Sequence, residues 1–266
     1  MKPTPTRRRL AIAAAAAVLL CSACALPDLR SPTPSAGPSL TAEQITALLA
    51  APDRSDADRR NDIRRKPAEM LGFVGVGPGM KVLDLSAGGG YTTELLARAV
   101  GPGGRAYGQS VPRNPPPART SAMALAERAQ KPAASAIVPV VQPFENPAPS
   151  GADRDALDLV TIMFNYHDLG AMGIDRARMN AAVFAALKRG GAYVIADHAG
   201  RPGTGISESN TLHRIEEAFL KKEVEAAGFR LGGEGSFLRS PADPRDREEP
   251  EPPTRKDEFV LRFVKP

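Results

Sequence analysis

Short apolar runs alternate with longer amphipathic segments along most of this chain, and the alternation predicts its architecture. The apolar runs predict seven strands, at residues 82–85, 105–109, 136–141, 157–164, 192–196, 229–238 and 259–264. Apolar positions spaced by three and four residues predict helices at 41–51, 91–100, 118–130, 175–188 and 211–227. Helices between successive strands imply a parallel sheet, but no helix separates the last two strands, which must pair antiparallel. We therefore expect an α/β fold with a Rossmann-like, mostly parallel seven-stranded sheet and a C-terminal antiparallel hairpin.

The turn after the first predicted strand contains three consecutive glycines, Gly88 to Gly90. Glycine has no Cβ, so this backbone can take positive φ angles and let a ligand lie directly against the chain. Backbone N–H groups at the start of the following helix would face that ligand. We interpret the stretch as a nucleotide-type binding turn. The alternative is a glycine-rich strand-to-helix turn that binds no ligand.

The first residues have the organisation of an export signal. Lys2 and three arginines precede an apolar run at 10–20, which is too short to span a membrane and ends in small residues. Ser22-Ala23-Cys24 resembles a bacterial lipobox, whereas Ala23-Cys24-Ala25 fits ordinary signal peptidase. We favour the lipobox, and we expect an exported, periplasmic protein that is lipid-anchored at Cys24 to the bacterial envelope.

We expect three parts along the chain: a signal at 1–24, a flexible Pro-rich tether at 25–40 and a folded domain at 41–266. The composition of these parts limits the partners and bonds that the protein can have. Removing residues 1–23 deletes four basic residues and no acid, so the formal charge falls from +5 to +1. This balance implies no nucleic-acid partner, and we expect membrane contact only through the lipid anchor. The only cysteines, Cys21 and Cys24, precede the folded domain, which therefore has no disulfide and no thiolate metal site. Nothing in the sequence predicts an oligomeric state.

The part of the domain before the first strand is predicted to be helical. Thr41 is the expected N-cap of the first helix. Residues 53–66 then carry a dense alternation of acidic and basic side chains. We favour a solvated helix face for this segment; the alternative is a lid over the binding turn.

Polar and aromatic side chains gather where the fourth and fifth strands are predicted to end. Asn165-Tyr166-His167-Asp168 follows the fourth strand and Asp197-His198 follows the fifth, while His213 opens the next predicted helix. Ligands in open α/β sheets bind at the carboxyl ends of the strands. All three histidines of the chain are thus expected near one rim. The alternative is that each of them caps a local turn.

The glycine turn and several later segments resemble known methyltransferases. Its spacing, D-x-S-x-G-G-G, resembles motif I of the class I S-adenosylmethionine-dependent methyltransferases, with Ser86 where a glycine is usual. The segments 165–168, 197–198, 211–214 and 257–261 look like those of a family of exported bacterial methyltransferases, as do 65–69 and 240–246. This resemblance covers about residues 43–266. It implies a class I methyltransferase fold with S-adenosylmethionine as the cofactor.

The resemblance also implies roles for individual residues on the cofactor side. Contacts to S-adenosylmethionine fall on Asp84, Ser86, Gly88 and Gly90. Gln109, at the end of the second strand, stands where an acid usually binds the ribose hydroxyls. Two residues after the third strand are candidates for the adenine: Phe144 for stacking on the ring and Glu145 for accepting its amino group. An ordinary core position is the alternative for Phe144.

The residues after the fourth strand are the candidates for catalysis. His167 is the expected general base, since an imidazole titrates near neutral pH, and Asp168 or Asp197 would orient it. Asn165 and Tyr166 would shape the acceptor pocket. A variant that we do not favour places a divalent metal on Asp168, Asp197 and a histidine, as the metal-dependent O-methyltransferases suggest.

The function that these observations favour is methyl transfer from S-adenosylmethionine to a small-molecule acceptor. S-adenosylmethionine is made in the cytosol, so export raises a second hypothesis, a catalytically inactive exported binding protein that retains the fold. Ser86 and Gln109, which depart from the family pattern, favour this alternative. The grouping of the histidines favours an active site.

Overall fold

The computed structural model describes residues 38–112, 121–250 and 255–266, together with Met1. The expected signal at 1–24 and the tether as far as residue 37 lie outside the described residues, as do 113–120 in the first Pro-rich loop and 251–254 in the last. In the described part of the chain, no helix combines the length and the apolar character that crossing a membrane requires.

The centre of the fold is one sheet of seven strands in the order β3-β2-β1-β4-β5-β7-β6. Its strands are β1 (Lys81–Leu85), β2 (Arg105–Ser110), β3 (Ile137–Val141), β4 (Leu157–Met163), β5 (Leu187–His198), β6 (Arg230–Gly235) and β7 (Glu258–Val264). Strands β1 to β5 pair in parallel, whereas β7 lies antiparallel between β5 and β6. The predicted sheet and its antiparallel ending are confirmed. The strand order reverses direction between β1 and β4, which places the switch point beside the glycine turn.

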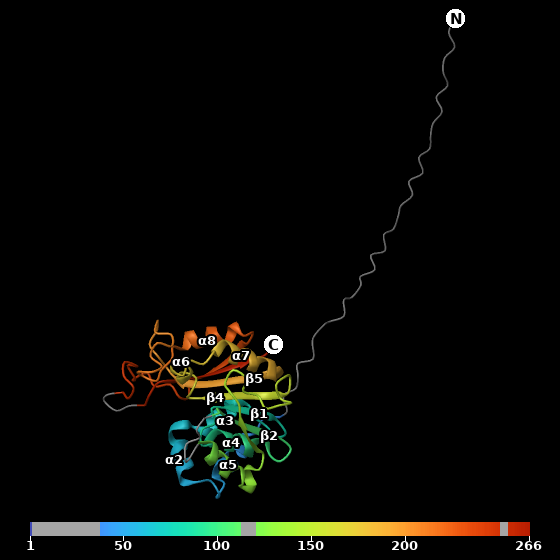
Figure 1. Ribbon diagram of the computed structural model, residues 1–266, viewed down its shortest axis with the longest axis vertical. Helices are drawn as coiled ribbons and strands as arrows, with labels where there is room; N and C mark the ends of the chain where they lie inside the picture. Colours follow the sequence, from blue (N-terminus) through green and yellow to red (C-terminus); the bar gives the residue numbers. More distant parts are fainter. Residues whose placement is uncertain (2–37, 113–120, 251–254) are drawn as a thin grey trace. The chain divides into compact units, whose positions relative to one another are not determined.

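Helices cover both faces of this sheet, as Figure 1 shows, with α3, α4 and α5 on one face and α7 and α8 on the other. The helices are α1 (Ala42–Ala50), α2 (Asp56–Arg65), α3 (Pro67–Val74), α4 (Tyr91–Val100), α5 (Ser121–Ala129), α6 (Asp168–Ala171), α7 (Arg176–Ala186) and α8 (Glu217–Ala226). A short 3₁₀ turn, Pro132–Ala134, precedes β3. Thr41 caps α1 as expected and forms a capping box with Gln44.

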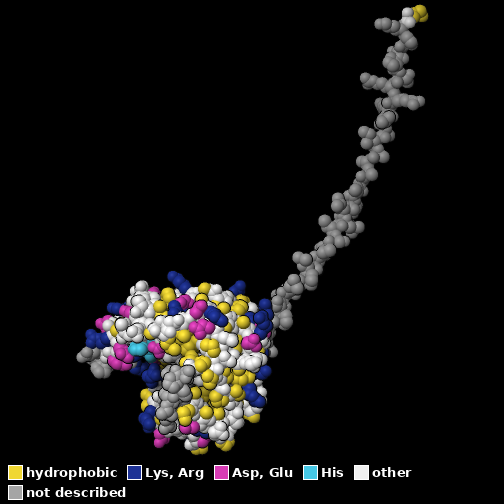
Figure 2. Space-filling view, in the orientation of Figure 1, with side chains coloured by type: hydrophobic (Ala, Val, Ile, Leu, Met, Phe, Trp, Pro, Cys, Tyr) yellow, Lys and Arg dark blue, Asp and Glu magenta, His cyan; other side chains and the backbone are white. Residues whose placement is uncertain are grey.

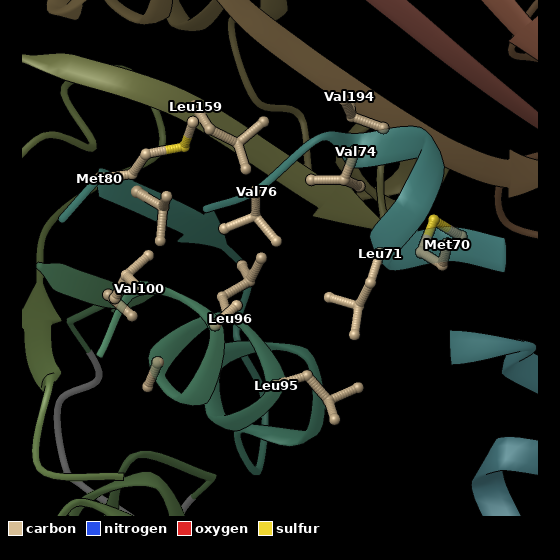
Figure 3. Close-up of a cluster of buried hydrophobic side chains, with 14 of the residues drawn as sticks. Met70, Leu71, Val74, Val76, Met80, Leu95, Leu96, Val100, Leu159 and Val194 are labelled. Carbon is tan, nitrogen blue, oxygen red and sulfur yellow. The ribbon is translucent and has the colours of Figure 1, made fainter. Parts of the chain in front are cut away.

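Alternate residues of the strands feed two hydrophobic cores, one on each face of the sheet. Val82 of β1 joins the core beneath α3 and α4, whereas Leu83 and Leu85 join the core beneath α7 and α8. Figure 3 shows the first of these cores, where Leu96 of α4 points toward the sheet and Leu71 of α3 points toward α4. Both faces of the central strands are therefore buried, which explains their nearly continuous apolar sequences.

Two predicted boundaries are wrong, and tertiary contacts explain both. Strand β5 begins at Leu187, inside the helix expected to reach Lys188, because Leu187 pairs with Leu157 of β4. The helix expected at 211–227 begins only at Glu217. Ile215, which falls within that predicted helix, instead forms a β-bridge with Ala199.

Candidate functional site

The glycine turn between β1 and α4 has one open side and one packed side. Ser86, Gly88 and Gly90 have φ angles of 54°, 55° and 85°. A Cβ on Gly88 would meet only the carbonyl oxygen of Ser86, at 3.9 Å, and the residue is exposed. A Cβ on Gly90 would lie 2.7 Å from Leu125 Cδ1 of α5. The turn therefore offers bare backbone to a ligand at Gly88, while Gly90 serves close packing between α4 and α5.

Gln109 holds the glycine turn in place from inside the protein. Its side chain is fully buried; Oε1 accepts from the Ser86 N–H at 2.9 Å, and Nε2 donates to the Gln142 carbonyl at 2.7 Å. Both ends of the amide are thus bonded to backbone. The expectation that Gln109 binds ribose hydroxyls is not met here, because the side chain turns inward and links β1, β2 and the residue after β3.

Asp84 lies beneath the same turn and is almost completely buried. Its two oxygens accept from Thr93 Oγ1 of α4, at 2.6 Å, and from Thr161 Oγ1 of β4, at 2.8 Å. Burial raises the pKa of Asp84 to about 6, although the two hydroxyl donors oppose the shift. The carboxylate therefore ties α4 to the switch point instead of facing an exposed ligand.

Three other predicted residues lie in or near the core. Tyr166 is fully buried; its hydroxyl accepts from Asn180 Nδ2 at 2.8 Å and donates to Glu223 Oε2 at 3.1 Å. Phe144 is also buried, in the core beneath α7 and α8, while Glu145 is half-buried and accepts from the Asp175 N–H at 3.3 Å. The expected role of Tyr166 in shaping an acceptor pocket is wrong, because tertiary packing takes its ring into the core. Phe144 takes the core position that the sequence left as its alternative.

Arg65, the last residue of α2, is a charged side chain near the turn that the sequence did not single out. Its guanidinium carbon lies 4.0 Å from the centroid of the Phe164 ring, and it has no hydrogen bond or ion pair within the described ranges. With Tyr91 and Thr161 it lines a small apolar cavity of about 20 Å³. Burial lowers the pKa of Arg65 to about 10, so it keeps its charge at neutral pH. Three basic residues directly before Pro67 were the available signal.

The charged helix α2 is fastened to its neighbours by ion pairs. Arg128 of α5 contacts Asp58 at 2.7 Å and also reaches Glu94 of α4 at 2.6 Å. Asp62 accepts from Arg54 at 2.6 Å and from the Tyr91 hydroxyl at 2.7 Å. The favoured interpretation, a solvated face, is therefore incomplete, because one side of α2 is paired against α4 and α5.

The ends of β4 and β5 bring the three histidines together, as the sequence predicted. The ring centroids of His198 and His213 lie 5.4 Å and 5.6 Å from that of His167. Asp168 Oδ1 contacts both His167 Nε2 and His213 Nδ1, each at 3.0 Å. Asn165 Nδ2 donates to the other oxygen of Asp168 at 2.7 Å. We call these residues, together with Asp197, the histidine cluster.

Asp197 orients the central imidazole of the histidine cluster. It is fully buried; Oδ1 lies 2.6 Å from His167 Nδ1, and Oδ2 accepts from the His167 backbone N–H at 2.7 Å. Burial lowers the pKa of His167, but Asp197 and Asp168 outweigh that effect and raise the pKa to about 9. The imidazole is therefore mostly protonated at neutral pH, with a carboxylate at each nitrogen.

A cleft of about 520 Å³ opens beside the histidine cluster. It is lined by Ile63, Arg64, His198, Glu249, Arg255, Lys256 and Glu258. Figure 2 shows histidine side chains at the surface among acidic and basic groups. Glu258 accepts from Arg64 at 3.0 Å and lies 3.1 Å from His198 Nδ1. A cleft of this size suits a small molecule, and its charged lining suits a polar one.

No protein-family model and no curated protein sequence matches this chain. Solved structures are nevertheless similar to it. An S-adenosylmethionine-dependent methyltransferase from Aquifex aeolicus is 19% identical, with a TM-score of 0.57, over 86% of this chain and 100% of its own. Geranyl diphosphate C-methyltransferase from Streptomyces coelicolor is 15% identical, with a TM-score of 0.55, over 83% of this chain and 88% of its own.

An arsenic(III) S-adenosylmethionine methyltransferase from Chlamydomonas reinhardtii is 17% identical, with a TM-score of 0.53, over 84% of this chain and 73% of its own. These proteins are all S-adenosylmethionine-dependent methyltransferases, yet their methyl acceptors differ widely. Fold similarity at such identities says nothing about the acceptor. The chain has the Rossmann-like fold of the class I S-adenosylmethionine-dependent methyltransferases.

Proposed function

We propose that this protein transfers a methyl group from S-adenosylmethionine to a small polar acceptor. The observation that carries the proposal is the placement of two features at one edge of the sheet. The open glycine turn follows β1, and the histidine cluster follows β4 and β5, on either side of the switch point. A cofactor bound at the turn and an acceptor in the cleft beside His198 would meet at this edge.

The cofactor side of the proposal rests on bare backbone and on one unpaired cation. Gly88 leaves room for the ligand against the main chain, while Asp84 and Gln109 are positioning residues that fix the turn. Arg65 lies beside the start of α4, directly after the turn, and forms no ion pair in the described part of the chain. We assign Arg65 to the carboxylate of the methionine moiety, because a partly buried guanidinium favours such a partner.

Methyl transfer is an in-line displacement at carbon. A lone pair of the acceptor oxygen or nitrogen forms the new bond to the methyl carbon, and the carbon–sulfur bond breaks with its electrons on sulfur, leaving S-adenosylhomocysteine. The protein mainly aligns the two reactants. The acceptor proton passes to His167 Nε2 in the fraction of molecules in which that imidazole is neutral. Because the pKa of His167 is raised to about 9, turnover should increase with pH up to that region.

Calorimetry with S-adenosylmethionine tests the cofactor assignment on the full chain. We expect binding with a dissociation constant of about 1 μM to 1 mM, the usual range for enzyme substrates. Arg65→Gln should lower the affinity for S-adenosylmethionine at least about tenfold, since a charged hydrogen bond is worth about 1.5–3 kcal/mol. It should leave the affinity for adenosine unchanged, because adenosine lacks the carboxylate. Arg60→Gln is the matched control, because Arg60 is an exposed arginine on the same helix.

Two results would count against this proposal. A folded protein that binds no S-adenosylmethionine at about 1 mM would exclude the transferase function, since enzyme KM values lie at or below that level. If Arg65→Gln lowered the affinities for S-adenosylmethionine and adenosine equally, the assignment of Arg65 to the carboxylate would be rejected. With an acceptor identified, His167→Ala should lower turnover while leaving cofactor affinity nearly unchanged.

We also propose that the protein is exported and anchored through Cys24. The support is the basic start, the short apolar run and the small residues before Cys24. An intact mass of the protein isolated from a bacterial envelope should show acyl chains on a chain that starts at Cys24. A mature mass without acyl chains, or one beginning after Ala25, would reject Cys24 as the anchor.

A further inference from the structure

Three potential metal-ligating atoms converge at the outer edge of the histidine cluster. They are His167 Nε2, an Asp168 carboxylate oxygen and His213 Nδ1, and all of them lie within 4.8 Å of one another. Asp168 Oδ1 is 3.0 Å from each of the two ring nitrogens. One carboxylate oxygen is thus shared between two imidazoles, and the second of them, on His213, comes 45 residues after Asp168 in the sequence. The three atoms are thus close enough to face a single ion.

The distances agree with a common coordination sphere. Metal–nitrogen and metal–oxygen bonds to such ligands are about 2.0–2.2 Å. Two ligands at that distance, with an angle of about 90–109° between them, are about 3.0–3.4 Å apart. The two separations from Asp168 Oδ1 fall at the short end of this range, while His167 Nε2 and His213 Nδ1 lie within 4.8 Å of each other, so the two imidazoles would close around an ion that enters.

The groups behind the three ligands match the usual outer shell of a metal site. A metal-bound histidine almost always gives its second ring nitrogen to a carboxylate or a carbonyl group. His167 does so, with Nδ1 2.6 Å from the buried Asp197, and this leaves Nε2 to face Asp168. Asn165 braces the second oxygen of Asp168. Ser209 further fixes His167 by donating a hydrogen bond to its backbone carbonyl.

His213 is held at this place in an unfavourable backbone conformation. Its φ is 50°, which is uncommon for a residue with a side chain, and its imidazole is 44% exposed. The neighbouring Arg214 is fully buried, paired with Asp243 at 2.9 Å and bonded to the Ala199 carbonyl at 3.0 Å. Strained residues that the surrounding structure fixes tend to occur at functional sites.

We infer that His167, Asp168 and His213 bind one divalent transition-metal ion of the Zn²⁺ or Fe²⁺ type. Two imidazoles and one carboxylate suit such borderline ions, whereas Mg²⁺ and Ca²⁺ prefer oxygen ligands alone. Asp197 is not a ligand but orients His167, which distinguishes this set from the one expected from the sequence. Three protein ligands leave coordination positions for a further group, as catalytic sites require.

The metal site does not depend on the proposed methyl transfer, but in that reaction an ion on His167 Nε2 would replace this imidazole as the group that activates the acceptor, because a metal-bound nitrogen cannot accept a proton. His198 lines the neighbouring cleft, so an acceptor there would lie next to the ion. The ion would hold and polarise an acceptor hydroxyl or carboxylate, taking the place of the proton between His167 and Asp168. Metal binding itself involves none of the residues assigned to S-adenosylmethionine. The two proposals can therefore fail separately.

Cobalt titration of the full chain, after dialysis against a chelator, tests the inference by visible absorption. We expect one equivalent of Co²⁺ to produce ligand-field bands, and Zn²⁺ to abolish them. His213→Ala should lose this binding, and Asp197→Asn should weaken it by about 10–100-fold, the usual effect of removing an outer-shell partner. Any contribution of Cys21 and Cys24 is common to all variants and cancels in the comparison.

His198→Gln is the matched control, since His198 lies as close to His167 but faces Glu258 instead of Asp168. It should retain the cobalt bands, and circular dichroism should show that every variant is folded. Absence of the bands at about millimolar Co²⁺, or the same affinity in His213→Ala as in the unmodified protein, would overturn the inference. Equal losses of Co²⁺ affinity in His198→Gln and His213→Ala would also overturn it. S-adenosylmethionine calorimetry on the same samples tells whether the cofactor proposal stands independently.

Discussion

The glycine turn and the histidine cluster lie at the same edge of the sheet, yet they are built in opposite ways. Each depends on a buried aspartate. Asp84, under the turn, accepts hydrogen bonds from two neutral threonine hydroxyls. Asp197, in the cluster, accepts from a histidine ring and from the backbone N–H groups of His167 and His198. The first carboxylate has no bonded cation, whereas the second has one.

The difference shows how the two regions use charge. Burial without a bonded cation raises the pKa of Asp84 to about 6, which favours its neutral form. In the cluster two carboxylates raise the pKa of His167 to about 9, which favours the charged imidazole despite its burial. The aspartate under the turn is therefore held by neutral hydrogen-bond donors, whereas the cluster holds a charged imidazole between two carboxylates.

Removing the aspartate of the cluster should have the largest effect on stability. Asp197→Ala leaves His167 without its buried partner, and breaking a buried pair costs about 3–5 kcal/mol. Asp168→Ala is the comparison, because Asp168 is 29% exposed and should cost only about 1 kcal/mol. Urea denaturation of both variants measures the two values. Equal costs would show that Asp197 is not the anchor of the cluster.

The aspartate under the turn, Asp84, should instead make the free energy of unfolding depend on pH. The folded-state pKa of Asp84, about 6, lies above the ordinary aspartate value of 3.8, so the folded state binds more protons between these values. Its contribution is therefore fully present below about pH 3.8 and is lost as pH rises through about 6, by about 3 kcal/mol in total.

Asp84→Asn cannot ionise and removes this dependence. The stability of the unmodified protein relative to Asp84→Asn should fall by about 3 kcal/mol between about pH 3.5 and about pH 7.5. Denaturation at the two pH values gives the difference. A constant difference would mean that Asp84 ionises as easily in the fold as in the unfolded chain.

The smallest expected effect separates the two sides of the glycine turn. Gly90→Ala must place a Cβ 2.7 Å from Leu125 Cδ1 at positive φ, which should cost about 2–3 kcal/mol. Gly88→Ala meets no such neighbour and should cost only about 1 kcal/mol through its φ. Binding should show the reverse order. Relative to the stability that each variant loses, Gly88→Ala should lower the affinity for S-adenosylmethionine more than Gly90→Ala does. Thermal denaturation and calorimetry measure the two effects.

Much of the fold could be predicted because its signals are local. The apolar run of β1, the three glycines after it and the helical pattern of α4 are contiguous, and the structure places all three as expected. The capping box at Thr41 spans only four residues, so Thr41 could likewise be predicted as the N-cap of α1. The start of α8 could not be predicted in this way, because contacts with Ala199 and Asp243 set the conformation of residues 211–216, which their own apolar periodicity would make helical.

The candidate site was predicted less completely. Sequence reasoning placed the three histidines at one rim, since strand ends of a parallel sheet meet there. It could not tell that Tyr166 turns into the core or that Gln109 is bonded at both ends to backbone. It also missed Arg65, because nothing local indicates that one arginine in a charged helix packs against the ring of Phe164.

The order of residues alone determined which segments form strands and helices and which side chains lie near the carboxyl ends of the strands, because these follow from spacing and from residues near in the chain. Only the tertiary structure decided the direction in which those side chains point and the partners that they meet. Asp168, shared by His167 and His213, is the clearest case. The contact joins segments that backbone periodicity leaves independent, and packing of the sheet with its loops brings them together.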